Sequence, residues 1–173
     1  DVIVVGGGHA GSEAALAAAR LGCHVFLFTM TIDTIGLMPC NPSIGGPAKG
    51  QIVGEIDALG GEMGRCADET FIQLKVLNRS RGPAVQCLRS QNDKVDYGNY
   101  MKKKVTTHPL ITVIESEVYG LLIENKTIHG IITQDGTSYT SPTVVLTTGT
   151  FLKARMHTGL TNISGGRVNE AAA

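Results

Sequence analysis

The chain has 173 residues, of which 42% are hydrophobic and 17% are charged, and its formal net charge is zero. This is the composition of a globular domain that can bury a core, and no apolar run is long enough to span a membrane, so we expect no membrane partner. A neutral total charge neither favours nor excludes nucleic acid. The chain begins on a predicted strand without Met and stops in GGRVNEAAA, so we expect it to be one piece of a longer protein.

The first thirty residues predict a strand, a glycine-rich turn, a helix and a second strand. The apolar run DVIVV at 1–5 is typical of a buried parallel strand, and the alanine-rich segment 12–22 predicts a helix that stops at Gly22. HVFLFT at 24–29 predicts the second buried strand. A unit of this size is the context in which a glycine fingerprint indicates a dinucleotide.

The turn GGGHAG at 6–11 fits the pattern G-x-G-x-x-G. Gly6 permits the tight turn, Gly8 lets the backbone approach a pyrophosphate, and Gly11 lets helix and strand pack closely. The helix N-terminus offers free N–H groups to the phosphate charge. We therefore predict a dinucleotide here, with a plain tight turn as the alternative. The predicted cofactor-binding residues are Gly6, Gly7, Gly8, His9, Ala10 and Gly11, and the His9 ring either approaches the cofactor or faces solvent.

The carboxylate that usually ends the second strand of such a unit is missing. Thr29 holds that place, and Asp33, four residues later, is the nearest substitute. The contact to the ribose 2′-hydroxyl therefore stays open.

Residues 30–50 predict an irregular loop, because GLMPCNPSIGGPAKG at 36–50 contains four glycines and three prolines around Cys40. Lys49, near its end, either meets an anionic group of cofactor or substrate or is solvated. Apolar residues at helical intervals predict a helix over 51–64.

The segment 65–90 is mixed, and a further helix is predicted over 91–107. Residues 75–104 carry a local excess of six positive charges: Lys75, Arg79, Arg81, Arg89, Lys94, Lys102, Lys103 and Lys104 against Asp93 and Asp96. Such an excess indicates either a surface for nucleic acid or an ordinary solvated helix.

From residue 111 the pattern changes to strands, with turns at Asn125-Lys126 and Asp135-Gly136, and TVVLTT at 143–148 predicts a last buried strand. By analogy with flavoproteins of the glutathione-reductase type, a β-meander and a returning strand that ends in Thr-Gly favour FAD over NAD. The predicted fold is α/β, a Rossmann-like FAD-binding domain with a parallel sheet, helices on one face and the meander on the other. Thr148 and Gly149 are then predicted beside the cofactor.

Four cysteines, Cys23, Cys40, Cys66 and Cys87, lack the spacing of metal ligands, so no metal site is predicted. Free thiols in a reducing cytoplasm are the expectation. Cys23, Cys66 and Cys87 are predicted to be structural, whereas Cys40 is either a small apolar filler or a reactive thiol.

Several stretches, in order along nearly the whole chain, resemble the MnmG/GidA family: DVIVVGGGHAGSEAALAAARLG, CNPSIGG followed by KG, EIDALGGEM, LNRSRGPAV, VVLTTGTFL and SGGR. These are FAD-dependent enzymes that install the carboxymethylaminomethyl group at C5 of the wobble uridine of tRNA. The resemblance implies that residues 1–173 are part of the FAD-binding domain of a longer, multi-domain chain. This family also lacks the acid at Thr29.

The resemblance further implies roles for individual residues. Gly6 to Gly11 would bind the FAD diphosphate, and Val118 and Ala173 match positions that contact FAD. Cys40 would be a catalytic thiol near the flavin, since a thiolate that adds at C6 of uracil makes C5 nucleophilic. The local charge excess, and not the resemblance, predicts that Arg79 and Arg81, beside the Gly82-Pro83 turn, contact tRNA or a flavin phosphate. Lys49, near the end of the 36–50 loop, is predicted to contact an anionic group of flavin or substrate.

The family also implies NADH and methylenetetrahydrofolate as co-substrates, tRNA as the macromolecular substrate, a partner GTPase and a homodimer. Two alternatives stay open. One is a folate- and FAD-dependent tRNA uracil-5-methyltransferase, against which the CNPSIGG and EIDALGG stretches argue. The other is an isolated FAD-binding module without activity of its own.

Overall fold

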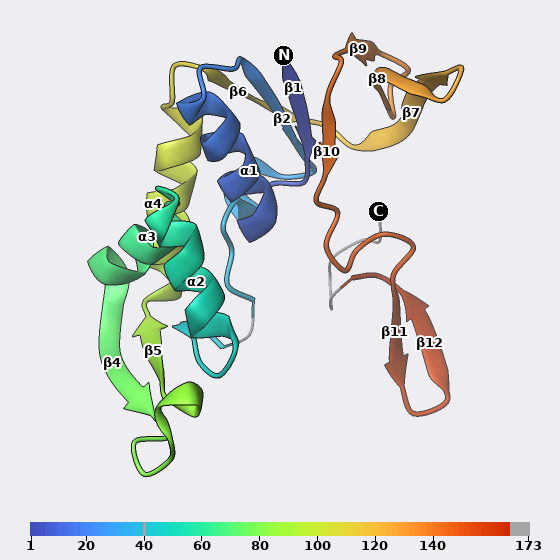
Figure 1. Ribbon diagram of the computed structural model, residues 1–173. Helices are drawn as coiled ribbons and strands as arrows, with labels where there is room; N and C mark the ends of the chain where they lie inside the picture. Colours follow the sequence, from blue (N-terminus) through green and yellow to red (C-terminus); the bar gives the residue numbers. More distant parts are fainter. Residues whose placement is uncertain (40, 167–173) are drawn as a thin grey trace.

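A central parallel sheet organises the computed structural model, which describes residues 1–39 and 41–166 (Figure 1). Its strands are β1 (Val2–Val5), β2 (Val25–Thr29), β6 (Ile111–Glu115) and β10 (Val144–Leu146), in the order β10-β1-β2-β6. All three pairings are parallel. The strands predicted at 1–5, 24–29 and 143–148 are therefore present, and β1 lies inside the sheet, as its continuous apolar sequence indicates.

Each face of the sheet is covered by a different layer, because successive side chains on a strand point to opposite faces. Val4 and Leu27 belong to the core shared with the helices α1 (His9–Arg20) and α4 (Lys94–Thr106). Ile3 and Phe28 instead pack against Ile131 of the meander. Figure 1 shows α1 and α4 on one side and the meander on the other, so the predicted layer order is confirmed.

The meander consists of β7 (Val118–Glu124), β8 (Thr127–Thr133) and β9 (Ser138–Thr140), which pair in an antiparallel sheet. Asn125 and Lys126 have positive φ values of 49° and 65° at the first turn, and Gly136 has φ 84° at the second. Both hairpin turns lie where the sequence predicts them.

A second antiparallel sheet was not predicted. It contains β3 (Ser43–Gly45), β5 (Cys87–Asn92) and β4 (Phe71–Leu77), in the order β3-β5-β4. Part of the predicted irregular loop thus pairs in β3. The strands of this sheet lack a clear alternation, and the first five residues of β4 are all exposed, so hydrophobic periodicity gave no signal.

Two helices, α2 (Lys49–Ala58) and α3 (Met63–Thr70), replace the single helix expected over 51–64. Gly60, with φ 84°, follows the end of α2, and the chain restarts as α3 at Met63. The helix stop at Gly60-Gly61 was predicted, but the new helix after it was not.

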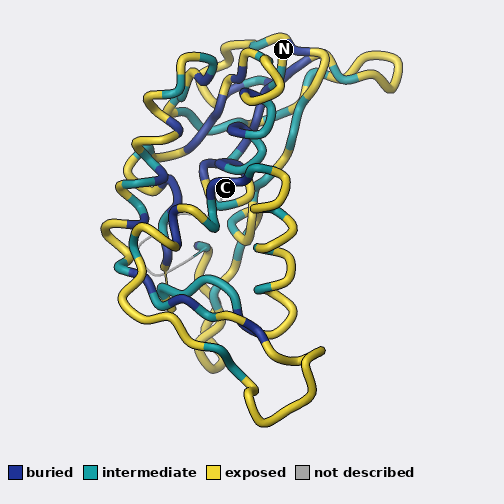
Figure 2. The backbone as a smooth tube through the Cα atoms, turned by 60° about the vertical axis from the view of Figure 1, so that its left-hand side comes forward, coloured by how far each residue is buried: buried dark blue, intermediate teal, exposed yellow. Residues whose placement is uncertain are grey.

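The described chain also contains two short 3₁₀ turns, η1 (Ile32–Thr34) and η2 (Pro83–Val85). Near its end it forms a hairpin of β11 (Arg155–Thr158) and β12 (Thr161–Ser164). Buried residues gather around the central sheet and its helices, whereas the outlying hairpins are mostly exposed (Figure 2). Over residues 1–39 and 41–166, no helix combines the length and the apolar character needed to cross a membrane.

The seating of the meander on the sheet can be tested at Ile131, which is fully buried. We expect Ile131→Ala to lower the free energy of unfolding by about 2–5 kcal/mol, because it leaves a cavity between two layers. Ile123→Ala, in the same meander but 58% exposed, should change it by less than about 0.5 kcal/mol. Denaturant unfolding measures both, and equal losses would contradict this seating of the meander.

Candidate dinucleotide site at the carboxyl edge of the sheet

The carboxyl ends of all four parallel strands meet at one edge of the central sheet. The glycine-rich turn follows β1 there, between β2 on one side and β10 on the other. The chain leaves β1 toward β2, whereas β10 returns from far along the sequence to the other side of β1. Ligands of open α/β sheets bind at such points, where the connections diverge.

The turn is held by backbone hydrogen bonds on both flanks. The Gly6 N–H donates to Phe28 O at 2.8 Å, and the Gly36 N–H donates to Gly7 O at 3.2 Å. Gly8 caps α1, and Ser12 N–H donates to its carbonyl at 2.9 Å. The first N–H groups of α1 therefore point out of the helix without intrahelical partners, as at any helix start.

Three glycines in the turn differ in the space around them. A Cβ atom on Gly11 would stand 1.7 Å from Gly6 O, and one on Gly6 would stand 2.4 Å from Thr147 O. A Cβ atom on Gly8 would meet nothing within 4 Å, and Gly8 is exposed. Gly6 and Gly11 are therefore required by the packing of the turn, whereas Gly8 offers bare backbone to a ligand.

Thr147 closes the turn from the β10 side, and the sequence did not reveal it. Its N–H donates to Val5 O at 2.8 Å, and its hydroxyl lies 2.8 Å from Val5 O and 3.1 Å from Gly6 O. The predicted residues Thr148 and Gly149 come directly after it. Their contact with a cofactor stays a prediction, and the Thr-Thr-Gly sequence was the only signal for Thr147.

The side chain of His9 turns inward rather than toward solvent. Its ring meets the ring of Tyr97 on α4 edge to face, with centroids 5.7 Å apart. The Nδ1 atom is buried and has no hydrogen-bond partner among the described residues. Burial lowers the pKa of His9, so the ring is neutral at pH 7. The expected approach of this ring to the cofactor stays a prediction.

Glu13 ties α1 to α3. Its carboxylate accepts the N–H of Glu62 at 2.9 Å and the N–H of Met63 at 2.5 Å, so it satisfies the free end of α3. Glu62 in turn accepts the Tyr100 hydroxyl at 2.6 Å and pairs with Lys104 at 3.1 Å. These contacts join residues that are 38 to 50 positions apart, and no local pattern predicts them.

Burial alone would raise the pKa of Glu62. The hydrogen bond from Tyr100 and the charge of Lys104 outweigh that effect, so the pKa of Glu62 is lowered overall. Glu62 is therefore a carboxylate at neutral pH, and it holds α4 against α3.

No carboxylate follows β2 directly. Thr29 is buried, and its hydroxyl donates to Thr31 O at 3.2 Å. Asp33, the nearest substitute in sequence, is exposed and pairs with Lys102 on α4 at 3.0 Å. Glu115, at the end of β6, instead brings a carboxylate to this edge and accepts the Ile32 N–H at 2.7 Å.

The remaining predicted cofactor residues lie at this edge or outside the described residues. Val118 is half-buried and starts β7 three residues after β6 ends. Cys40 and Ala173 lie outside the described residues.

Arg79 and Arg81 do not lie at the glycine-rich turn. Both are exposed in the loop between β4 and β5, at the tip of the second sheet and well away from β1 (Figure 1). Gln86 donates its side-chain amide to Arg81 O at 2.9 Å, which gives this loop a defined shape. Lys49 is exposed at the start of α2, beside the same sheet.

The described cysteines are free thiols, Cys23, Cys66 and Cys87. Cys66 is fully buried, and burial, with the nearby charge of Glu62, raises its pKa to about 12. A thiol of this kind is protonated and unreactive at neutral pH. Residues 1–39 and 41–166 contain no group of three or more His, Cys, Asp or Glu side chains that could hold a metal ion.

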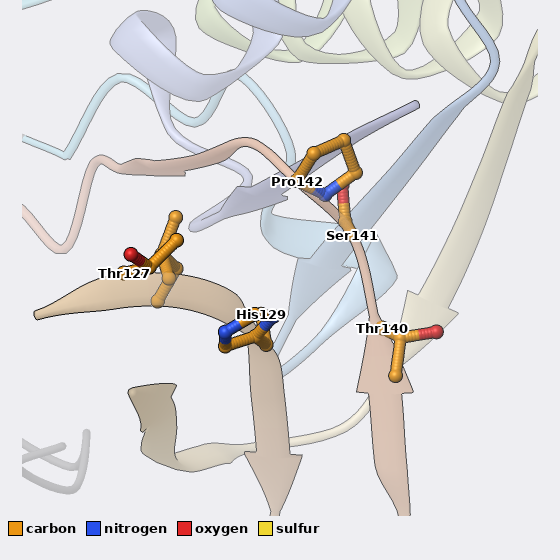
Figure 3. A pocket seen from close by; sticks show the side chains of 6 residues that line it. Thr127, His129, Thr140, Ser141 and Pro142 are labelled. Carbon is orange, nitrogen blue, oxygen red and sulfur yellow. The ribbon is translucent and has the colours of Figure 1, made fainter. Parts of the chain in front are cut away.

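A hollow of about 370 Å³ lies outside this site, lined by Thr127, Ile128, His129, Thr140, Ser141 and Pro142 (Figure 3). Ser141 donates its hydroxyl to Asp1 O at 2.9 Å, so the hollow sits at the amino end of β1. The carboxyl edge with the glycine-rich turn is at the other end of the strand. We do not assign the hollow to the dinucleotide.

Comparisons with known proteins agree along the whole chain. The family described as "Glucose inhibited division protein A" matches residues 1–173. The tRNA uridine 5-carboxymethylaminomethyl modification enzyme MnmG of Bacillus licheniformis is 52% identical over 170 residues, and that of Alkaliphilus metalliredigens is 51% identical over 166 residues. These alignments cover 98% and 96% of this chain but only 27% and 26% of the relatives, so the chain spans about a quarter of their length.

Solved structures of GidA and of a GidA-related protein also superpose on this chain. GidA of Aquifex aeolicus superposes with a TM-score of 0.95 at 49% identity, over 100% of this chain and 29% of that chain. The GidA-related protein of Thermus thermophilus matches 99% of this chain and 63% of its own, with a TM-score of 0.66 at 23% identity, which shows a shared fold.

Gly11 is closely surrounded by protein atoms and Gly8 is not, so alanine substitutions at these two positions test the packing of the turn. We expect Gly11→Ala to lower the free energy of unfolding by about 3 kcal/mol or more, because its methyl group would overlap Gly6 O. Gly8→Ala should cost less than about 1 kcal/mol, since Gly8 has φ −73° and open space around it. Thermal or denaturant unfolding of both variants checks this, and an intact Gly11→Ala protein would refute the close approach.

Proposed function

This chain belongs to the glucose-inhibited division protein A family, and we propose that residues 1–173 form part of the FAD-binding domain of an enzyme that modifies tRNA. The proposed reaction adds a carboxymethylaminomethyl group to C5 of the wobble uridine. The observation that carries this proposal is the identity of about half of all residues with enzymes named for this modification, over nearly the whole chain.

The glycine-rich turn supports FAD as the cofactor. Its diphosphate would lie against the free N–H groups of the first turn of α1, where the helix dipole favours negative charge. Gly8 leaves the backbone accessible, and the carbonyl of Gly6 is engaged as an acceptor of the Thr147 hydroxyl at 3.1 Å. FAD would supply redox chemistry, with NADH as its reductant and methylenetetrahydrofolate as the source of the one-carbon unit.

The protein's own contribution at this edge is to hold the turn without side chains in the path of the phosphates. Thr29 and Ile35 pack against Gly7 from behind, where a Cβ atom would stand 2.9 Å and 3.1 Å from them. The turn therefore cannot move toward the sheet, and the exposed backbone at Gly8 keeps its position. Preorganisation of this kind lowers the entropic cost of binding.

Cys40 is the proposed catalytic thiol. A thiolate that adds to C6 of the uracil ring makes C5 nucleophilic, which is the activation that substitution at C5 requires. The sequence around it, with prolines on both sides, is suited to holding one direction of the side chain.

The second sheet is the proposed tRNA-facing part of the chain. Lys75 and Arg89 are direct cross-strand partners in β4 and β5, and Arg79 and Arg81 lie in the loop between these strands. Like charges opposite each other on a sheet destabilise it, and an anionic backbone would relieve that repulsion. Binding of a partner GTPase and formation of a homodimer are proposed for the full-length protein on the family relationship.

Flavin binding tests the cofactor. The purified full-length protein should show flavin absorbance, and Gly8→Ala should weaken FAD binding at least tenfold while the unfolding temperature changes little. The methyl group would occupy the space that the diphosphate needs, but it touches no protein atom. Wild-type protein that binds no FAD in a titration would overturn the proposed cofactor.

Analysis of the modified nucleoside tests the reaction and Cys40 together. With its GTPase partner, the wild-type enzyme should give carboxymethylaminomethyl uridine in tRNA, whereas a 5-methyl product would favour the methyltransferase. Cys40→Ser should lower product formation at least a hundredfold and leave FAD bound, with Cys23→Ser as the control that keeps activity. Full activity of Cys40→Ser would remove Cys40 from the mechanism.

Charge reversal tests the tRNA surface. We expect Arg79→Glu with Arg81→Glu to weaken tRNA binding and to reduce the slope of log K against log salt by about one for each phosphate that the variant no longer neutralises. Lys126→Glu, a reversal in the exposed turn of the meander, serves as the control. Unchanged affinity at low salt would show that this loop does not contact tRNA.

A further inference from the structure

Two buried polar atoms belong to side chains that are in contact between α1 and α4. His9 Nδ1 and Tyr97 Oη are both enclosed, and neither has a hydrogen-bond partner among the described residues. Their rings are in edge-to-face contact, with 5.7 Å between centroids and 69° between planes. Buried polar groups in folded proteins are nearly always satisfied, so a pair of orphaned atoms on touching side chains calls for an explanation.

The two groups are chemically complementary. Burial lowers the pKa of His9, so the imidazole is neutral and can accept a hydrogen bond at Nδ1. Burial also raises the pKa of Tyr97, so its hydroxyl keeps the proton that it can donate. The neighbouring titratable side chains bond to backbone groups and not to these two atoms. The Cys66 thiol donates to the backbone carbonyl of Tyr97 at 3.6 Å, and the Glu13 carboxylate accepts the N–H groups at the start of α3.

His9 is also the only residue of the turn with a side chain longer than a methyl group, since the sequence from 6 to 11 is GGGHAG. Glycines leave a backbone free to adopt many conformations, so this turn must be fixed by contacts from outside. Thr147 supplies such contacts on the β10 side. Ser12 of α1 donates its hydroxyl to Gly7 O at 3.5 Å, and His9 is the residue of the turn whose side chain reaches α4.

We propose that one bridging water accepts a hydrogen bond from the Tyr97 hydroxyl and donates one to His9 Nδ1, and that this positioning pair holds the first turn of α1 in the conformation that binds the cofactor diphosphate. The inference rests on the proposed FAD function and adds to it a pair of residues that acts behind the turn. The same bond fixes His9 as the tautomer with its proton on Nε2.

The test is a double-mutant cycle on FAD affinity in the full-length protein. Tyr97→Phe and His9→Leu should each raise the dissociation constant about tenfold, and the double variant should be no weaker than the weaker single variant. His9→Asn keeps an acceptor close to the position of Nδ1, so it should stay within about threefold of wild type. Fluorescence titration gives the constants, and melting curves identify variants that fail to fold.

Tyr100→Phe is the matched control. It removes a hydroxyl from the same helix, three residues further on, but that hydroxyl is bonded to Glu62 at 2.6 Å. It should lower the unfolding temperature without changing FAD affinity more than about twofold.

If the losses of FAD binding free energy in the two single variants add up in the double variant, His9 and Tyr97 do not act as a pair. A Tyr97→Phe variant that binds FAD as tightly as wild type would also contradict the proposal. Equal weakening by His9→Asn and His9→Leu would show that the ring only fills space. Wild-type protein that does not bind FAD would overturn the proposed function itself, which separates the two failures.

Discussion

The approach of α1 to the end of β1 is the constraint on which the site depends. Gly11 lies so close to Gly6 O that no side chain fits between them, and Thr147 presses on Gly6 from the other side. The helix can therefore begin directly above the strand, with its N-terminus at the carboxyl edge of the sheet. The phosphate-binding role proposed for this edge rests on that packing, because it places free N–H groups and the positive end of the dipole at one point.

The rest of the helix layer keeps α1 at this point. Glu13 bonds the start of α3, and Glu62, at that same start, holds Tyr100 and Lys104 of α4. The meander on the opposite face adds Ile131 and Tyr139 against Phe28, so both sides of the sheet are covered. Among these residues Glu13 is the one on α1 itself, so its bonds are the contacts that fix α1 against α3.

The central unit could be predicted from the sequence because its signals are local. Continuous apolar strands, the glycine spacing and the two hairpin turns each lie within a few residues. The second sheet escaped prediction because β4 has mostly exposed residues and no alternation. The sequence also did not predict the contacts of Thr147, the inward ring of His9 or the role of Glu13. Each of these depends on a partner that lies 49 to 142 residues away in the sequence or on another helix.

The return of β10 to β1 has a consequence for the order in which the chain assembles. Ile3 pairs with Val144, so this contact closes a loop of about 140 residues, while β1 and β2 meet after a short helical connection. During synthesis from the N-terminus, the turn and α1 can form early, but the hydrogen bonds from Thr147 to Val5 O and Gly6 O cannot form until residue 147 has been made. A nascent chain shorter than this contains the glycine-rich turn without the strand that flanks it on the β10 side, so the proposed nucleotide site forms only after β6 and the meander have been made.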